Sequence, residues 1–431
     1  MRFSKRSQRQ SGMSTPRILV IGTGDTKADE LRFIENCIRQ AGGQPISMDV
    51  SVLGDPPYKP DYDKHTVLAA AGHHLDKARA GGDEMSAMTY MAEGAAALTR
   101  RLHAEGRIDA FIALGGTMGT DLALDVALAL PLGVPKFVVS TIAYSHLLPP
   151  DRIATDLMMI LWAGGLYGLN SICKAVLSQA AGAVVGAAKA VVVPAKAKPV
   201  IGMSSLGKSC LAYMVDLKPE LEKRGYELVV FHTTGMGGRA LEALAAQKGF
   251  VAVMDFSLQE LANFHNGSVV NSGPDRLENA GIAGIPQIVA PGAIDMIDMP
   301  AWQTPPSHLQ ARTYYAHNRL IGMVTADEET RREVARKIGA KLSTATAPVA
   351  FILPTRGIEQ WDQEGEPFYD PAGLAAFVDE MGRSVAAPAE LHAIDAHIND
   401  PAFVETALAI LDRWVAAGIV PAGRPDATEA A

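Results

Sequence analysis

Cysteine is scarce in this chain, and the cysteines that are present form no recognisable set. Of the 431 residues only Cys37, Cys173 and Cys210 are cysteines, and no two of them have the spacing of a metal site. Three cysteines also cannot form a closed set of disulfides. The pattern therefore favours a reduced, cytoplasmic protein in which each cysteine is a small buried apolar side chain.

Long apolar runs and broad positive charge are missing as well. The longest run of small apolar residues, AAGAVVGAAKAVVVPA, is broken by Lys189 and Pro194, so we expect no association with a membrane. The net charge of −8 leaves no wide basic surface, so we expect no nucleic-acid partner and only local recognition of phosphate. The G-x-S-x-G and H-E-x-x-H patterns of common hydrolases are also absent.

The N-terminus is basic, and we expect it not to be a secretory signal. Residues 1–16 contain arginine and lysine without any acid, and the apolar run that follows, ILVI, is too short for the core of a signal peptide. We expect residues 1–16 to be a disordered leader.

What the chain does have is a globular composition on the scale of two domains. Hydrophobic residues make up 48% and charged residues 20%, and a chain of this length exceeds one ordinary core. The segment VVVPAKAKP, with prolines on both sides of its lysines, is the best linker candidate. We expect an N-terminal domain over 17–193 and a C-terminal domain over 198–431.

Strand and helix patterns alternate through both halves. RILVIGTG predicts a buried strand and a glycine turn, the next segment has helical spacing up to Gly42-Gly43, and QPISMDVS predicts another strand. The predicted strands of the second half are KPVIGMS, ELVVFHTTG, FVAVMDFS, IPQIVA, RLIGMVT and PVAFILP. The fold class expected is therefore α/β, with two tandem Rossmann-like domains, mostly parallel sheets and an interdomain cleft.

The first strand-end motif is GTGDTK. Its residues are Gly22, Thr23, Gly24, Asp25, Thr26 and Lys27. Backbone and hydroxyl donors of this turn could bind a phosphate, with Lys27 as a positive charge and Asp25 as a contact for Mg²⁺ or a ribose hydroxyl. The alternative is a simple turn in which Asp25 caps the helix.

Two further motifs are expected at the same edge of the first sheet. GGTMGTD places Gly115, Gly116, Thr117, Gly119 and Thr120 directly before a helix, which is typical of an anion-binding nest, and it ends at Asp121, a second candidate for Mg²⁺. VVSTIAYSH ends a strand at Ser140 and Thr141. Tight turns and self-satisfied hydroxyls are the structural alternatives.

The stretch GMSSLGKS matches the written pattern of a phosphate-binding P-loop. It runs from Gly202 to Ser209 and contains Lys208, and FVAVMD offers Asp255 as the acidic partner that such a loop needs. The alternative is an ordinary turn between a strand and a helix.

A fifth segment, from Val269 to Asp298, combines two turn clusters with acids and an arginine. Ser272, Arg276 and Asp295 are the residues that we expect to contact a small carboxylate or phosphate substrate. Structural caps and ion pairs are the competing explanation.

Taken in order, these motifs resemble one family, the ATP-binding domain of the tomato mosaic virus resistance protein and its bacterial relatives. The matching pieces are IGTGDTKADEL, LGGTMGTDLAL, LGVPKFVVSTIA, GLNSICKAVLSQAAGA, YELVVFHTTGMGGRALE, NSGPDRLENAGIAGIPQIVAPGAIDMID, FYDPAG and DAHINDPAF. They run from residue 21 to about 403. The resemblance implies two α/β domains, ATP bound in the first, and a homodimer.

The resemblance also shows where this chain departs from its family. Relatives carry a threonine-rich turn where this chain has Gly207-Lys208-Ser209, so the P-loop match is local to this sequence. Relatives tend to carry an Asp where this chain has Gly165, and an Arg where it has Val324 and Thr325.

Three functions follow as hypotheses. The first is a protein that binds ATP and Mg²⁺ and acts on a small metabolite in the interdomain cleft, as an ATP-dependent transferase, ligase or hydrolase. The second is a nucleotide-sensing or partner-binding protein without turnover. The third is a P-loop kinase that uses Lys208.

Overall fold

The computed structural model describes residues 15–80, 84–191, 198–207 and 212–425. The chain divides into two compact units, residues 2–194 and residues 195–431, called here the N-terminal unit and the C-terminal unit. Most of the expected leader and of the expected linker lies outside the described residues. Each unit is described by itself.

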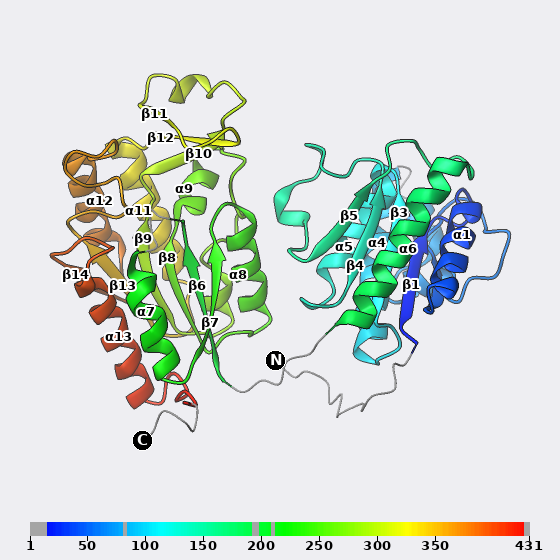
Figure 1. The fold of residues 1–431 in the computed structure, drawn as a ribbon, viewed down its shortest axis with the longest axis horizontal. Coiled ribbons are helices and arrows are strands. Elements are labelled where there is room, and N and C mark those ends of the chain that lie inside the picture. The colour runs from blue at the N-terminus through cyan, green and yellow to red at the C-terminus, as the bar shows by residue number, and fades with distance from the viewer. Residues whose placement is uncertain (1–14, 81–83, 192–197, 208–211, 426–431) are drawn as a thin grey trace. The chain divides into compact units, whose positions relative to one another are not determined.

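The N-terminal unit is built on a five-stranded parallel sheet with the order β2-β1-β3-β4-β5 (Figure 1). Its strands are β1 (Arg17–Gly22), β2 (Gln44–Asp49), β3 (Ala110–Gly115), β4 (Lys136–Ser140) and β5 (Leu157–Leu161). Its helices are α1 (Ala28–Gln40), α2 (Lys64–Ala69), α3 (Leu75–Ala80), α4 (Glu84–Ala104), α5 (Thr117–Leu128) and α6 (Ser171–Ala190), with a 3₁₀ turn η1 (Pro150–Arg152). The α/β fold class expected from the sequence is confirmed.

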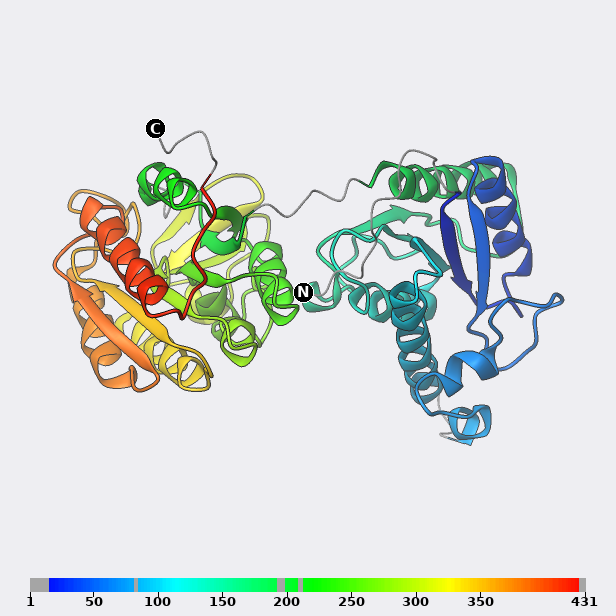
Figure 2. The same cartoon turned by 90° about the horizontal axis from the view of Figure 1, so that it is seen from below.

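Alternation along each strand divides the core of the N-terminal unit into two layers. Leu19 and Ile21 face one side of the sheet, in a cluster with side chains of α4 and α5. Their neighbours Ile18 and Val20 face the other side, in a cluster with side chains of α1 and α6. Because successive strand residues point to opposite faces, a continuous apolar run such as ILVI needs a helical layer on each side. Figure 2 shows these helices on both sides of the sheet.

Helix α6 is the one helix in the described part of the chain that is long and apolar enough to cross a membrane by length and composition. The helix begins at Ser171, before the alanine-rich run, which is why the run alone looked too short. Its inner face, including Cys173, Leu177 and Val184, is buried in the core that it shares with α1. With this buried face, α6 packs as a core helix of the N-terminal unit.

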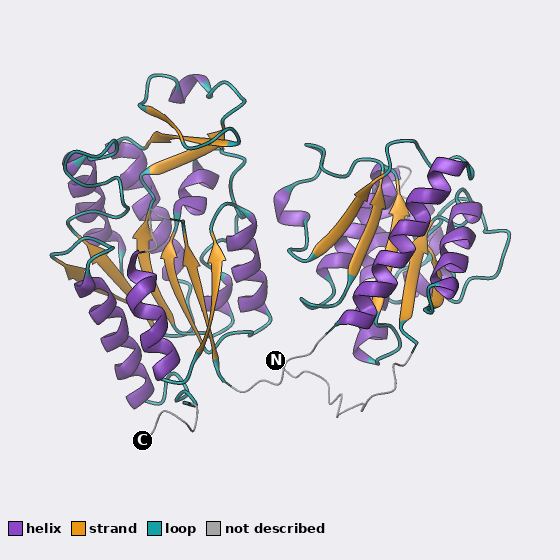
Figure 3. Ribbon diagram, viewed as in Figure 1, coloured by secondary structure: helices purple, strands orange, loops and turns teal. Residues whose placement is uncertain are grey.

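The C-terminal unit has a six-stranded parallel sheet with the order β14-β13-β9-β8-β6-β7 (Figure 3). The strands are β6 (Val200–Ser205), β7 (Glu227–His232), β8 (Ala252–Ser257), β9 (Gln287–Gly292), β13 (Val349–Pro354) and β14 (Ala389–Ile394). The helices are α7 (Ala212–Lys223), α8 (Met236–Ala246), α9 (Gln259–His265), α10 (Asn279–Ile282), α11 (Glu328–Leu342), α12 (Pro371–Ser384) and α13 (Pro401–Ala416).

A small antiparallel sheet interrupts the alternation in the C-terminal unit. It has the order β10-β12-β11, from β10 (Met296–Pro300), β11 (Tyr314–Ala316) and β12 (Ile321–Thr325), with a 3₁₀ turn η2 (Ser307–Leu309) between the first two. RLIGMVT was expected to add a strand to the parallel sheet, and that expectation was wrong. The short turn from β9 to β10 leaves no room for the crossover of about a dozen residues that a parallel connection needs, so β10 leaves the parallel sheet. RLIGMVT forms β12, which pairs antiparallel with β10 and β11.

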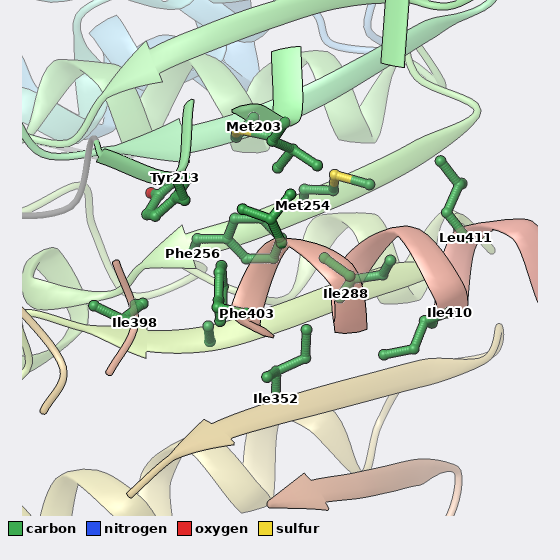
Figure 4. Close-up of a cluster of buried hydrophobic side chains, with 14 of the residues drawn as sticks. Met203, Tyr213, Met254, Phe256, Ile288, Ile352, Ile398, Phe403, Ile410 and Leu411 are labelled. Carbon is green, nitrogen blue, oxygen red and sulfur yellow. The ribbon is translucent and has the colours of Figure 1, made fainter. Parts of the chain in front are cut away.

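The largest core cluster lies under one face of the C-terminal sheet, between the strands and helices α7 and α13. Figure 4 shows the rings of Tyr213, Phe256 and Phe403 gathered beside Met254 and Ile288. The ring centroids of Phe256 and Phe403 are 4.9 Å apart, and those of Phe256 and Tyr213 are 5.5 Å apart. These edge-on contacts hold α7 and α13 against the sheet.

Close packing of α11 on α12 depends on Gly339. A Cβ at this position would stand 2.8 Å from the carbonyl carbon of Ser384, whereas a Cβ at Gly382 would meet nothing within 4 Å. We predict that Gly339→Ala lowers the free energy of unfolding by about 1–3 kcal/mol because the backbone must move. Gly382→Ala is the matched control and should be neutral or stabilising by about 0.5–1 kcal/mol. Thermal unfolding of both variants tests this, and equal midpoints would contradict it.

Candidate functional site

The three strand-end motifs of the first half lie in one row at the carboxyl edge of the N-terminal sheet. Strands β1, β3 and β4 end at Gly22, Gly115 and Ser140, and they are adjacent and parallel, with Gly115 opposite Ser140. The strand order reverses between β1 and β3, because the chain moves from β1 outward to β2 and then returns to β3. In open α/β sheets, ligands bind outside the carboxyl ends of the strands at such a reversal.

The turn after β1 presents hydroxyls and a lysine at this edge. The amide of Lys27 donates to the carbonyl of Thr23 (2.9 Å), and the hydroxyls of Thr23 and Thr26 lie 2.9 Å apart. Thr26 is exposed and Lys27 is half-buried. Among the described residues, the Lys27 ammonium has no acidic partner. The turn therefore offers a free positive charge next to two hydroxyls.

Asp25 and Gly24 in the same turn are tied to the segment that follows β2. The amide of Gly24 donates to Oδ1 of Asp49 (2.9 Å), and the Ser51 hydroxyl donates to both Asp49 (2.5 Å) and Asp25 (3.0 Å). The amide of Gly54 donates to the second oxygen of Asp25 (3.0 Å). Asp25 therefore holds two loops together, and it is not a helix cap.

Asp49 is a residue of this edge that the sequence reasoning missed. It is buried at the end of β2, and its Oδ2 has no hydrogen-bond partner among the described residues. Burial, with the nearby carboxylates of Glu35 and Asp49, raises the pKa of Tyr58 to about 12. An acid at the end of the strand QPISM is the signal in the sequence that points to this residue.

The turn after β3 opens helix α5 with its first backbone N–H groups uncapped by any side chain. A Cβ at Gly115 would stand 2.5 Å from the Cα of Gly119, so glycine is needed for the helix to start so close to the strand. At Gly116 a Cβ would meet only the hydroxyl of Thr141, at 3.7 Å. Gly116, Thr117 and Thr141 thus border open space at the N-terminus of α5, where an anion is favoured.

Thr120 and Ser140 belong to the structure beneath this space. Their hydroxyls are 2.7 Å apart, and Oγ of Ser140 also accepts the amide of Ile142 (3.0 Å). Both residues are fully buried. Their hydroxyls connect the end of β4 to α5. The exposed threonines of this edge are Thr26 and Thr117.

The segment after β5 also reaches this edge. The amide of Gly168 donates to Oε1 of Glu30 in the first turn of α1 (2.8 Å), so residues 162–170 pass beside the turn that contains Lys27. Gly165 has a φ of +76°, in the left-handed region that favours glycine, and its carbonyl accepts the indole N–H of Trp162 (2.6 Å). Tyr167 is almost fully exposed.

The two carboxylates expected to bind Mg²⁺ each have a partner already. Asp121 forms an ion pair with Arg152, which also contacts Asp125 (2.7 Å). Asp25 accepts from Ser51 and Gly54, as described above. Within the described ranges, no group of three or more His, Cys, Asp or Glu side chains is placed to hold a metal ion.

In the C-terminal unit, Arg276 lies at the centre of a buried cluster of carboxylates. Its side chain bonds Asp255, Glu260 and Glu242, and it also donates to the carbonyl of Ser257 (3.0 Å). These contacts use all five N–H donors of the guanidinium. Burial raises the pKa of both Glu242 and Glu260 to about 7. In this structure Arg276 has no donor left for a substrate.

The same cluster bears on the P-loop match. Asp255, the acid that a P-loop would need, is buried and engaged by Arg276 and by the hydroxyl of Ser204 (2.6 Å). Lys208 and Ser209 lie outside the described residues. The acidic half of the match therefore has a structural role here.

Ser272 and Asp295, the other expected substrate residues, are both buried. The hydroxyl of Ser272 and both carboxylate oxygens of Asp295 have no hydrogen-bond partner among the described residues. Arg331 and Asp370 are among the charged groups that act on Asp295, and neither is among those that act most strongly on Arg276, so Asp295 and Arg276 take part in different clusters.

The chain matches two family models along nearly its whole length. The N-terminal domain model of the Uncharacterised protein family (UPF0261) covers residues 16–192, and the C-terminal domain model of the same family covers residues 198–415. The chain belongs to the UPF0261 family.

Relatives agree with this assignment. A UPF0261 protein of Brucella melitensis is 63% identical over 410 residues, covering 95% of this chain and 98% of its own length. A UPF0261 protein of Clostridium tetani is 36% identical over 354 residues, covering 82% and 87%. The ToMV susceptible protein tm-1 of Solanum lycopersicum is 28% identical over 427 residues, which is 93% of this chain and 56% of that protein.

Solved structures resemble the chain only distantly. A glycosyltransferase of Streptomyces sp. SF2575 complexed with thymidine diphosphate has a TM-score of 0.19 and 14% identity, over 65% of this chain and 83% of its own. A UDP-N-acetylglucosamine 2-epimerase from Listeria monocytogenes, described as putative, has a TM-score of 0.21 and 11% identity, over 64% and 79%.

The position of Arg276 leads to a prediction about stability. Arg276→Ala leaves three buried carboxylates without their counter-charge, so we expect the C-terminal unit to lose about 3–5 kcal/mol of stability. Arg413→Ala is the control: it breaks an exposed ion pair with Glu390 and should cost less than about 1 kcal/mol. Scanning calorimetry measures both. An Arg276→Ala protein with unchanged thermal midpoints would show that the cluster is not what holds this unit together.

Proposed function

We propose that this protein binds ATP at the carboxyl edge of the N-terminal sheet. The observation that carries the proposal is the uncapped N-terminus of α5, which opens beside Gly116 at the end of β3, while the turn that contains Lys27 follows the neighbouring strand β1. Backbone N–H groups, hydroxyls and one lysine are the groups that bind phosphates at helix N-termini. The resemblance noted from the sequence implies ATP as the nucleotide.

The residues of this edge fit a nucleotide in different ways. Thr23, Thr26, Thr117 and Thr141 would donate hydroxyls or amides to phosphate oxygens, and Lys27 would balance their charge. Gly24, Gly115, Thr120 and Ser140 would act indirectly, because they shape the turns. When bound, the nucleotide would supply a phosphoryl group for transfer to a small metabolite, with Mg²⁺ placed near Asp25 or Asp121.

One observation favours the second hypothesis, nucleotide binding without turnover. Both carboxylates proposed for Mg²⁺ are engaged by other groups of the chain, Asp25 by Ser51 and Gly54 and Asp121 by Arg152. A phosphoryl-transfer site depends on a positioned metal ion. Consumption of ATP only when a carboxylate or sugar acid is added would favour the enzyme. ATP that stays intact across a broad panel of metabolites would favour the binding protein.

Calorimetric titration of Mg-ATP into three lysine variants tests the location of the site. We predict that Lys27→Ala weakens binding about tenfold to a hundredfold, since a charge-assisted hydrogen bond to phosphate is lost. Lys189→Ala is the matched control, because it removes the same charge from the end of α6, where Lys189 donates to the carbonyl of Ala41. This variant should bind like the wild type at the same salt concentration.

The third variant, Lys208→Ala, separates the proposal from the P-loop kinase. Unchanged affinity in Lys208→Ala, with the loss in Lys27→Ala, supports a site in the N-terminal unit. If Lys208→Ala abolishes binding and Lys27→Ala does not, the proposal is wrong and the P-loop interpretation holds.

A further inference from the structure

A second buried charge cluster lies in the C-terminal unit, at the carboxyl ends of β9 and β13. It consists of Asp295, Arg331, Glu359 and Asp362, called here the Asp295 cluster. Asp295 follows β9, Arg331 comes from the first turn of α11, and Glu359 and Asp362 lie in residues 355–370, which connect β13 to α12 without helix or strand. All four side chains are at most 1% exposed.

The Asp295 cluster contains an unusual number of polar atoms without a partner. Among the described residues these are Oδ1 and Oδ2 of Asp295, Nη1 and Nη2 of Arg331, Oε1 of Glu359 and Oδ1 of Asp362. Nη2 of Arg331 is 3.1 Å from Asp370, within reach of an ion pair but not aligned as a hydrogen bond. Buried polar groups are normally satisfied, so each exception calls for an explanation.

The Arg276 cluster provides an internal comparison, since it has the same charges. There, backbone amides donate to the acids: Glu260 accepts from Gly235 and Gly238, and Glu242 accepts from Leu277 and Asn279. In the Asp295 cluster, one amide donates to Glu359 (2.8 Å), one to Asp362 (3.1 Å), and none to the oxygens of Asp295. Three buried carboxylates near one guanidinium, with two amide hydrogen bonds among them instead of four, cannot all stay ionised at low cost.

Protons on the carboxyls account for the unpaired carboxyl oxygens of the cluster, but not for the Nη atoms of Arg331, which are donors. A protonated carboxyl is neutral and gains an O–H donor, which can satisfy a facing carboxylate oxygen. Burial, together with the charge of Asp295, raises the pKa of Glu359 to about 9 and that of Asp362 to about 7. Burial also raises the pKa of Asp295, against the opposing effect of Arg331.

We propose that the Asp295 cluster is a pH-sensitive switch: while its carboxyls share protons, it holds residues 355–370 closed over the ends of β9 and β13, and loss of those protons releases the segment. Backbone hydrogen bonds also hold the start of the segment: Thr355 and Arg356 donate to the carbonyls of Ile394 and Ala396, and Gly357 accepts the amide of Ile398. Ile358 and Phe368 anchor it in the two core clusters below, and its remaining acids, Glu364 and Glu366, are exposed.

Other charged groups around the Asp295 cluster set the pH window. They are Asp370 at the start of α12, Asp327 before α11, and His397 and Asp400 in the turn after β14. The ring of His397 lies 2.9 Å from the carbonyl of Glu359, and burial lowers its pKa. Protonation of His397 would destabilise the unit in acid. The effect of carboxyl deprotonation on opening of the segment is therefore measured above about pH 6.5.

The sign of the effect follows from these shifts. Raised carboxyl pKa values mean that the closed form binds protons that the open form releases. The closed form therefore becomes less stable as the pH rises through the pKa values of its carboxyls. From about pH 6.5 to 8.5, one group with a pKa of about 7 increases the opening constant about fourfold. His397 is neutral over this range and does not oppose the change.

Hydrogen exchange of the full-length protein tests the switch. Exchange rates of peptides covering residues 355–370, divided by their intrinsic rates, should show protection falling at least about fourfold between those two pH values in the wild type. The double variant Glu359→Gln, Asp362→Asn mimics the protonated pair, so its protection should stay nearly constant. Glu364→Gln, an exposed change in the same segment, should behave as the wild type.

Three results would overturn the proposal. They are wild-type protection that does not change with pH, an equal fall in the double variant, and a double variant that does not fold even at the lower pH. The last counts against the proposal because neutral side chains at 359 and 362 are what the closed form requires.

Discussion

All strands of the two large sheets run parallel, and this constraint decides where chemistry can occur in either unit. Parallel pairing brings every carboxyl end to one edge, and the helix that follows each strand begins there with unpaired N–H groups. The close start of α5 after β3 depends on this geometry, since Gly115 leaves only enough room for the backbone of Gly119. The turns after β1, β3 and β4 are neighbours for the same reason.

The two units use their carboxyl edges differently. In the N-terminal unit the start of α5 is uncapped, and the ammonium of Lys27 has no acidic partner among the described residues. In the C-terminal unit the start of α8 is already occupied, because Glu260 accepts the amides of Gly235 and Gly238 where an anion would otherwise bind. Arg276 donates to the same carboxylate and balances its negative charge. This contrast is the physical reason for assigning the nucleotide to the N-terminal unit.

The fold followed from the sequence to a large extent, while the roles of single polar residues did not. Runs such as ILVI and VAFIL are buried on both faces, which predicts parallel strands directly. RLIGMVT looks the same locally, but it forms β12, which pairs antiparallel with β10 and β11 instead of joining the parallel sheet. Arg276 and Asp255 are 21 positions apart in the sequence, and no local pattern reveals that they bond each other. Asp25 likewise appeared free because its partners, Ser51 and Gly54, come from another loop.

The central claim, a nucleotide site at the carboxyl edge of the N-terminal sheet, is tested most directly by mapping where Mg-ATP protects the backbone. Hydrogen exchange of the wild type with and without Mg-ATP locates the bound ligand without any substitution. The account predicts slower exchange in residues 22–27 and 116–120 and no change in residues 202–209. Protection confined to residues 202–209, or no protection anywhere at saturating Mg-ATP, would contradict it.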